Sequence, residues 1–431
     1  MTNKDRQEAE DLFDFIEKSP TAFHTVETMK EILSDAGFEE LCETKSWQID
    51  KGEKYFVCRN HSALIAFCVP KDGLNGCRIS ASHTDSPAFK LKENPEMDAG
   101  GAYVKLNVEK YGGMILSTWL DRPLSIAGRV FTDGKNGIEE HLVCLDEHPV
   151  VIPNLAIHMD RKMNEGYAYQ VQRDMLPIFS ERSSASLKKR LAKELSGRTE
   201  ESVKESDILS EELYLCVKER GALIGDEEEW MLAPRLDDLF AAFVSLSGIC
   251  RAKPREHLSV SAFLDNEEVG SGTKQGANSD FLTEVLDRIF DSLNIGTEER
   301  YCIKNNSFLV SADNAHAVHP NHQDKADPTN QPRMNGGLVL KYHGGAKYTT
   351  DAYSAAVFKK WCREWKIPYQ TYHNHSDIAG GSTLGNIMTS HLSIPAVDIG
   401  FAQLAMHSAV ETAGRKDIRH GIHFFEKFFS F

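Results

Sequence analysis

The feature that most constrains this chain is an apolar segment that ends abruptly in acidic residues. Residues 258–264 (LSVSAFL) alternate in the manner of a buried β-strand. The acidic segment 265–268 (DNEE) and a glycine-rich turn follow directly. Three carboxylates in four positions repel one another unless a cation lies among them, although charge runs are usually solvated turns. Metal-dependent hydrolysis needs one carboxylate as a ligand and another as a proton acceptor, and Glu267 and Glu268 can divide these roles.

Composition sets limits on the class of protein. The 431 residues, 41% of them hydrophobic, are enough for two domains or for one long α/β domain. A net charge of −15 argues against nucleic acid or an anionic membrane as the main partner. The nine cysteines are scattered without a CxxC pair, and no apolar run approaches the length of a membrane span. We therefore expect reduced thiols in a cytoplasmic protein.

The pattern of elements changes twice along the chain. Helices are expected at residues 8–18 and 20–36, and strands at 55–59, 63–69 and 78–82. From about residue 93, short strands follow one another without helices, at 104–108, 113–120, 125–131 and 141–144, and a basic helix is expected at 183–197. From Leu236 onward, helices and strands alternate again.

These changes predict an α/β fold with a mixed, mostly parallel sheet flanked by helices and an inserted β-rich second domain. The first domain is expected to be discontinuous and to contain residues 1–92 and 226–431. The inserted domain is expected at residues 93–225.

Five strand-like segments each lead to residues that can bind a metal. These are His83 and Asp85; Asp237 and Asp238; Glu267 and Glu268; Asp313 with His316 and His319; and His407. In open α/β sheets, ligands bind at the carboxyl ends of the strands, so the five segments can converge. A mixed set of imidazoles and carboxylates suits two divalent ions such as zinc, manganese or cobalt. Individually, each residue has an ordinary alternative, such as a hydrogen-bonded histidine or a helix cap.

Several motifs resemble, in order, those of the M18 aminopeptidases, the aspartyl aminopeptidase family. They are SPTAFH, ASHTDSPAFKLK, PRLDDL, LDNEEVGSGTKQGA, VSADNAHAVHPN and GFAQLAMHSAVETAG, and together they span almost the whole chain. The NEEVGSGTKQGA segment is also similar to the M42 aminopeptidases. The segments SHTDSP and SADNAHAVHPN favour M18.

The resemblance implies a role for individual residues at two metal sites. His83 and Asp313 match ligands of the first ion, Glu268 and His407 match ligands of the second, and Asp237 matches the bridging carboxylate. Glu267 matches the general base. The family often has asparagine where this chain has Asp238, which is a departure from the pattern. Asp85 is expected to hold His83 through its other ring nitrogen.

Other matches concern substrate binding and assembly. His316, Lys341 and Tyr348 match positions that hold substrate in the family. His158 matches a residue that reaches a neighbouring subunit's active site. The resemblance therefore implies self-association, from a dimer through the inserted domain to a twelve-subunit particle.

The sequence thus predicts an aminopeptidase with two divalent ions, zinc or alternatively cobalt or manganese, which removes one N-terminal residue from peptides. The resemblance and Lys341 favour acidic N-terminal residues, and a neutral, leucine-like preference is the alternative. A deacylase or carboxypeptidase on the same metal scaffold is a further possibility. A non-catalytic assembly or cargo protein with this fold is also possible, but Glu267 and all the matched ligands are present.

Overall fold

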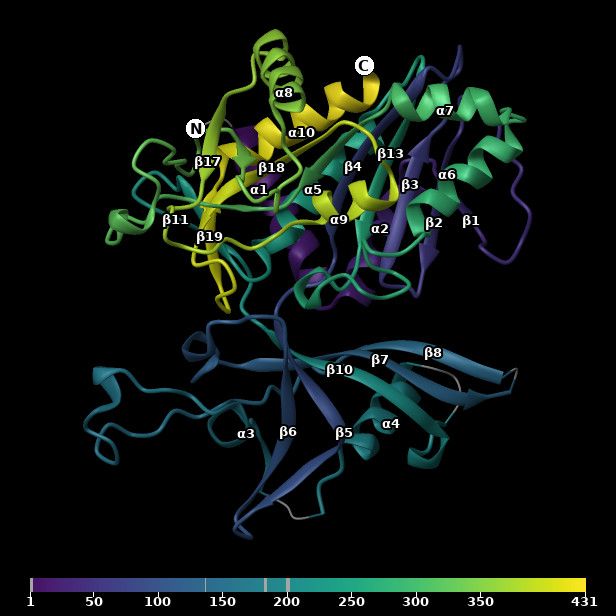
Figure 1. Cartoon of the computed structure of the whole chain (residues 1–431). Coiled ribbons are helices and arrows are strands. Elements are labelled where there is room, and N and C mark those ends of the chain that lie inside the picture. Colours follow the sequence, from purple (N-terminus) through teal and green to yellow (C-terminus); the bar gives the residue numbers. More distant parts are fainter. Residues whose placement is uncertain (1–2, 136, 182–183, 199–201) are drawn as a thin grey trace. The chain divides into compact units, whose positions relative to one another are not determined.

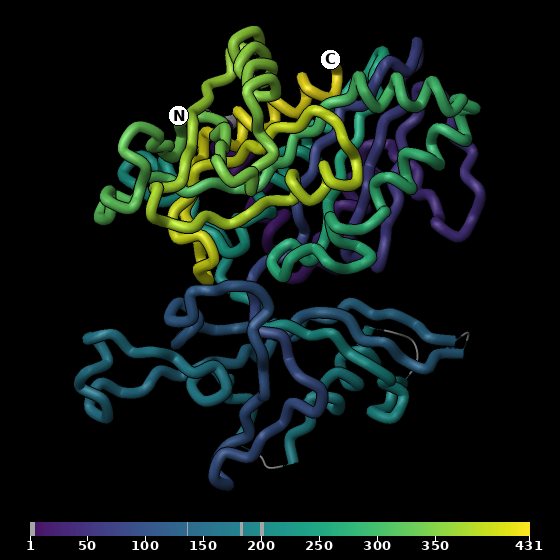
Figure 2. The backbone as a smooth tube through the Cα atoms, in the orientation of Figure 1, coloured from purple at the N-terminus to yellow at the C-terminus, as the bar shows by residue number. Residues whose placement is uncertain are grey.

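The computed structural model describes residues 3–135, 137–181, 184–198 and 202–431. The chain divides into two compact units (Figures 1 and 2). The first contains Met1–Asp85, Gly221–Met406 and Glu411–Phe431, and the second contains Ser86–Arg220 and His407–Val410. One unit has a mixed sheet with helices and the other a separate antiparallel sheet, which confirms the predicted fold class. Within the described ranges, no helix is long and apolar enough to cross a membrane.

The first unit is built on a 13-stranded sheet. Its centre is parallel and consists of β13 (His257–Leu264), β4 (Gly76–His83), β14 (Phe308–Ala312) and β18 (Ala396–Leu404). Antiparallel pairs lie on both sides of this centre. The other strands are β1 (Glu39–Leu41), β2 (Lys54–Arg59), β3 (Ala63–Cys68), β11 (Ala222–Ile224), β12 (Trp230–Ala233), β15 (Ala315–His316), β16 (Leu338–Tyr342), β17 (Tyr369–His373) and β19 (Glu411–Gly414).

Two apolar clusters cover this sheet. One contains side chains from α1 (Asn3–Lys18), α2 (Ala22–Asp35), α5 (Leu236–Arg251), α8 (Ala352–Trp365) and α10 (Lys416–Ser430). The other contains side chains from α6 (Phe281–Ser292), α7 (Thr297–Asn305) and α9 (Leu384–His391). β4 and β14 are buried along their whole length and β13 is buried from Leu258 onward, which agrees with the small number of charged residues in these strands.

Helices α5 and α10 approach each other at a glycine. A Cβ atom on Gly248 of α5 would lie 2.4 Å from the Cβ of Phe425 and 2.9 Å from its carbonyl carbon. Because backbone atoms cannot withdraw as a flexible side chain can, only glycine fits at this position. The close approach fixes α5, whose first residues belong to the candidate site described below.

The second unit contains a six-stranded antiparallel sheet in the order β8-β7-β10-β5-β6-β9. The strands are β5 (Ala88–Ala99), β6 (Tyr103–Tyr111), β7 (Leu124–Gly134), β8 (Gly137–Cys144), β9 (Ile178–Ser180) and β10 (Ile208–Val217). The helices are α3 (Val171–Asp174) and α4 (Leu187–Arg198). Leu187, Leu191 and Leu195 of α4 belong to the apolar cluster of this sheet.

Residues 113–120 do not form the predicted strand. They contain a 3₁₀ turn, η1 (Leu116–Trp119), because Thr118 bonds locally to the carbonyl of Ile115 through both its hydroxyl (2.7 Å) and its amide (3.2 Å). The unit begins at Ser86 rather than at residue 93. Helix α4 begins at Leu187, and residues 182 and 183 lie outside the described ranges.

Candidate metal centre

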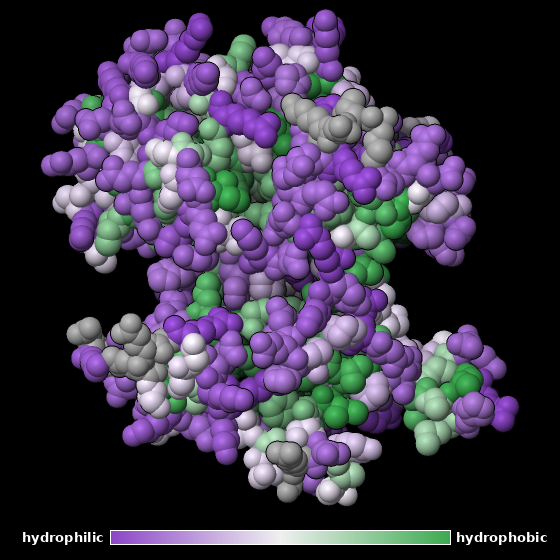
Figure 3. All heavy atoms as spheres, turned by 180° about the vertical axis from the view of Figure 1, so that it is seen from behind, coloured by the Kyte–Doolittle hydropathy of each residue, from purple (hydrophilic) through white to green (hydrophobic). Residues whose placement is uncertain are grey.

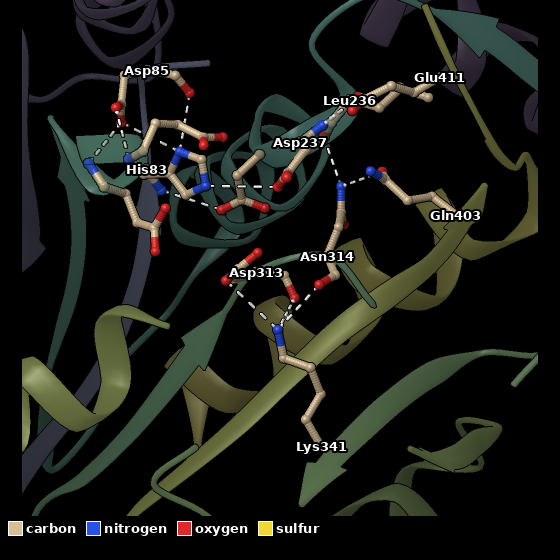
Figure 4. Close-up of polar contacts among 12 residues, drawn as sticks. His83, Asp85, Leu236, Asp237, Asp313, Asn314, Lys341, Gln403 and Glu411 are labelled. Carbon is tan, nitrogen blue, oxygen red and sulfur yellow. Dashed lines mark hydrogen bonds and ion pairs between the residues drawn. The ribbon is translucent and has the colours of Figure 1, made fainter. Parts of the chain in front are cut away.

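The candidate site lies at the carboxyl ends of the central parallel strands. His83 is the last residue of β4, Asp313 follows β14, and Asp237 and Asp238 begin α5. One nitrogen or oxygen atom from each of these four buried residues lies within 4.8 Å of the others (Figure 4). A second group within the same distance contains His83, Glu267 and Glu268. Parallel strands end at one edge of a sheet, which explains how distant segments meet here.

The start of α5 is irregular and is fixed by buried polar groups. Asp237 and Asp238 have non-helical backbone angles and are joined by a cis peptide bond. The amide of Asp237 donates to Oε2 of Glu411 at 2.9 Å, and Nδ2 of Asn314 donates to the carbonyl of Leu236 at 2.7 Å (Figure 4). Nδ2 of Asn314 also donates to Oε1 of Gln403 at 2.9 Å. These bonds determine where the Asp237 carboxylate points.

The two ring nitrogens of His83 have different surroundings. Nδ1 lies 3.0 Å from the backbone carbonyl oxygen of Asp85 and 3.4 Å from its carboxylate. A carbonyl can only accept, so Nδ1 bears a proton and Nε2 is the possible ligand atom. Nε2 lies 3.6 Å from Oδ1 of Asp237. Burial lowers the pKa of His83, but hydrogen bonds with Asp237 and Asp85 outweigh it and raise that pKa well above its ordinary value.

The Asp85 carboxylate has a further role that the sequence did not predict. Its two oxygens accept the backbone amides of Glu267 and Glu268, each at 3.2 Å. These residues open a 3₁₀ turn, η4 (Glu267–Val269), after Asn266, which adopts φ +61°. Asp85 thus fixes both the histidine and the acidic turn.

The carboxyl groups around this turn are difficult to ionise. Burial raises the pKa of Glu267 to about 8, with further increases from Asp313, Asp85 and Asp237 that outweigh the opposing effect of His83. Burial, together with the charge of Asp85, raises the pKa of Asp265 to about 7. Both shifts arise mainly from burial, and the neighbouring carboxylates add to it.

The donor set fits a divalent cation. Oδ1 of Asp238 is buried without a hydrogen-bond partner in the part of the chain that the structure describes. An orphaned buried carboxylate oxygen is costly, and a cation nearby would relieve that cost. Imidazole nitrogen and carboxylate oxygen are ligands that zinc accepts readily. No cysteine belongs to either of the His83 groups.

Lys341 lies beneath this cluster, on β16. The residue is only 2% exposed, and Nζ donates to the carbonyl oxygens of Asp313 (2.8 Å) and Asn314 (3.1 Å) (Figure 4). Nζ also lies 3.6 Å from Oδ2 of Asp313 and 5.1 Å from the ring centroid of Tyr348. Burial lowers the pKa of Lys341, but the effect of its neighbours, Asp313 above all, outweighs burial and raises that pKa above its ordinary value, so the ammonium is charged.

The matched substrate positions are linked by an aromatic residue that the sequence did not indicate. The ring of Tyr372 lies 6.0 Å from that of His316 and 6.5 Å from that of Tyr348. The Tyr372 hydroxyl donates to Oδ1 of Asn374 at 2.6 Å. Tyr372 lies outside all the quoted motifs. It belongs to β17, a different segment of the sequence from His316 and Tyr348.

His407 and His158 belong to the second unit. Nδ1 of His407 lies 2.7 Å from the carbonyl oxygen of Gly113, which makes Nε2 the nitrogen able to bind a cation. His158 is exposed in the segment between β8 and α3. Leu155, Ile157 and Met159 beside it are 45%, 44% and 77% exposed.

Three polar residues around Asp237 were not predicted: Asn314, Gln403 and Glu411. Asn314 and Glu411 lie inside motifs quoted above, but their partners are distant in sequence. Gln403 could have been found as a polar residue inside the apolar segment of β18.

Comparisons with known proteins identify the family of the chain. The model of the family described as "Aminopeptidase I zinc metalloprotease (M18)" matches residues 15–429. A "Probable M18 family aminopeptidase 2" from Clostridium novyi (strain NT) is 44% identical over 98% of both chains. A "Probable aspartyl aminopeptidase" from Ricinus communis is 34% identical over 97% of this chain and 94% of the relative.

Solved structures show the same fold. The chain in the "Cryo-EM structure of the Ape4 and Nbr1 complex" is 34% identical with a TM-score of 0.94, covering 99% of this chain and 86% of that one. The chain in the "Structure of S. cerevesiae mApe1 dodecamer" is 28% identical with a TM-score of 0.85, covering 99% and 97%. The resemblance stated from the motifs is thereby confirmed. The chain belongs to the M18 family of zinc metallo-aminopeptidases.

Proposed function

We propose that this M18 aminopeptidase removes single N-terminal residues from peptides with the help of two divalent ions. The observation on which the proposal depends is the buried group of His83, Asp237, Asp238 and Asp313, whose ligand atoms lie within 4.8 Å of one another. The high pKa of Glu267 and the orphaned oxygen of Asp238 support a cation at this position.

We assign the ligands by combining this geometry with the motifs. His83 and Asp313 would hold the first ion, Glu268 and His407 the second, and Asp237 would bridge them. Zinc is the proposed metal, since the family is described as zinc metalloproteases, with cobalt and manganese as alternatives. Asp85 would orient His83 and the Glu267–Glu268 turn.

The chain's own residues would supply the proton transfers. Divalent ions at this position supply Lewis acidity, which polarises a carbonyl group and lowers the pKa of water. Glu267 would accept the proton of the attacking water and pass it to the leaving amine. His316, exposed on β15, would donate to the developing oxyanion.

Substrate selection is proposed to favour aspartate or glutamate. The support is the Ricinus communis relative, which is named as an aspartyl aminopeptidase. Two of the three N–H donors of Lys341 face backbone carbonyls, which favours the alternative of a neutral preference.

His158 would complete the site of a neighbouring subunit in a dimer or dodecamer. The cytoplasmic location remains a prediction from the sequence.

Metal analysis with a substrate panel tests the function. Purified protein is expected to contain two divalent ions per chain, to lose activity on chelation and to regain it with zinc. Aminoacyl chromogenic substrates should show a kcat/KM for Asp or Glu at least about tenfold above that for Leu, since one charge-assisted contact can supply about 1.4 kcal/mol. N-acetylated substrates are the control, because an aminopeptidase needs the free amine and a deacylase does not. A protein that binds metal but hydrolyses no substrate would support the non-catalytic alternative.

A further inference from the structure

We propose that Lys341 is a positioning residue that holds Asp313 in its metal-binding geometry. The inference deepens the proposed function and rests on it, because it assumes that Asp313 binds an ion. Sequence matching assigned Lys341 only to the substrate. Its contacts in the structure point to the metal ligand instead.

Among the residues that the structure describes, Lys341 donates its hydrogen bonds to one dipeptide, Asp313-Asn314. Nζ donates to the carbonyl oxygens of Asp313 at 2.8 Å and of Asn314 at 3.1 Å, and lies 3.6 Å from Oδ2 of Asp313. A side chain that is 2% exposed and makes two charge-assisted bonds is fixed in place. Lys341 therefore holds both the backbone and the carboxylate at this position.

The dipeptide needs such support because it lies between β14 and β15, where the regular pairing with β18 is interrupted. The strand pairing with β18 stops at Ala312, and the amide of Asp313 makes one more bond, to the carbonyl of Ile399 at 3.1 Å. On the same strand, a Cβ on Gly400 would lie 2.1 Å from the carbonyl oxygen of Asp313. The carbonyl of Asp313 is thus packed closely against β18 and hydrogen-bonded to β16.

The same dipeptide reaches the start of α5. Nδ2 of Asn314 donates to the carbonyl of Leu236, the residue before the proposed bridging ligand Asp237. Asp313 and Asp237 are consequently linked through Asn314, and Lys341 fixes that link from below (Figure 4). Loss of Lys341 should disturb the position of Asp313 most and that of Asp237 less.

Positioning and charge have opposite effects on metal binding, and this difference makes the proposal testable. A lysine ammonium repels a divalent cation, so removal of its charge alone should tighten metal binding. Loss of a residue that orients a ligand typically weakens metal binding by 10- to 100-fold. The direction of the change therefore distinguishes the two effects.

The test is a zinc titration of metal-free protein, with binding followed by calorimetry and metal content by elemental analysis. Lys341→Met, whose unbranched side chain is one atom shorter and has no donor, should weaken binding of one ion by about 10-fold or more and change the other by less than about threefold. Lys359→Met is the matched control, because Lys359 lies over the ring of Tyr342 and should leave both affinities unchanged.

Lys341→Gln is the second variant and also serves if the methionine variant does not fold. Its neutral amide can still donate to the two carbonyls, so it should retain more metal affinity than methionine; an affinity equal to that of the methionine variant would contradict the proposal. Unchanged or tighter binding of both ions by either variant would overturn the proposal and leave the proposed function intact. Wild-type protein that binds fewer than two ions would instead refute the two-ion function, and the proposal with it.

Discussion

Glu267 is the residue whose chemistry can be tested most directly. Glu267→Gln preserves size and the turn held by Asp85, but an amide cannot accept the proton of water. We expect kcat to fall by at least about 10²-fold while both ions stay bound, since general-base catalysis typically contributes 10²–10⁴. Turnover and metal content measured on the same sample check this, with Glu268→Gln as the comparison that should lose an ion. Near-normal turnover in Glu267→Gln would remove the residue from the base role.

At the scale of single residues, the sequence indicated which residues belong to the site better than it indicated which of them contact one another. His83, Asp237 and Asp313 follow strand-like segments, and the parallel strands do end at one edge, where the structure places these residues together. The contact of Lys341 with residues 313 and 314 could not be predicted, because β16 and β14 are not neighbouring strands. The bond that the amide of Asp237 donates to Glu411 likewise joins residues 174 positions apart.

At the scale of secondary-structure elements, the close packing of α5 against α10 can be tested. Gly248→Ala would place a methyl group 2.4 Å from the Cβ of Phe425, and overpacking of this kind costs about 1–3 kcal/mol. The cost should exceed the gain of about 1 kcal/mol that alanine usually brings to a helix interior. We expect a lower melting temperature and weaker metal retention, because α5 begins with Asp237. Gly197→Ala in α4 is the control, since no atom of the described residues lies within 4 Å of its added Cβ, and it should be neutral or stabilising. An increase in Tm for Gly248→Ala would contradict the packing argument.

Elements with clear periodicity were predicted well, and those fixed by local polar bonds were not. The buried strand β13 begins one residue before the predicted segment at 258. Residues 113–120 are apolar enough to suggest a strand, but the bonds of Thr118 to the carbonyl of Ile115 produce a 3₁₀ turn. Hydrophobic periodicity cannot detect this competition, because it depends on where one hydroxyl points.

At the scale of the whole molecule, we predict that the chain assembles with copies of itself. Exposed apolar side chains at Leu155, Ile157 and Met159 flank His158, and Figure 3 shows apolar surface among the hydrophilic residues. Such exposure typically marks a protein contact. We expect light scattering to give a mass well above that of one 48.3 kDa chain.

Subunit mixing tests whether His158 acts in a neighbour's site. His158→Ala and Glu267→Gln chains should each have low activity, but mixed assemblies would contain sites with an intact Glu267 and a neighbour's intact His158. Random mixing in equal amounts should restore about a quarter of wild-type activity per site. A mixture no more active than its components, or a fully active monomer, would contradict the exchange of His158 between subunits.

The position of the second unit within the chain has a consequence for biosynthesis. β4 must wait for its sheet neighbours β13 and β14, which are made only after the whole segment Ser86–Arg220 has left the ribosome. All six strands of the second unit lie between Ala88 and Val217, so their partners are complete while the first unit still lacks the middle of its sheet. Domains generally fold in the order of their synthesis. In this chain the later-completed unit is the one that contains the N-terminus, and its apolar β3 and β4 lack their common sheet neighbour β13 until the second unit has been made.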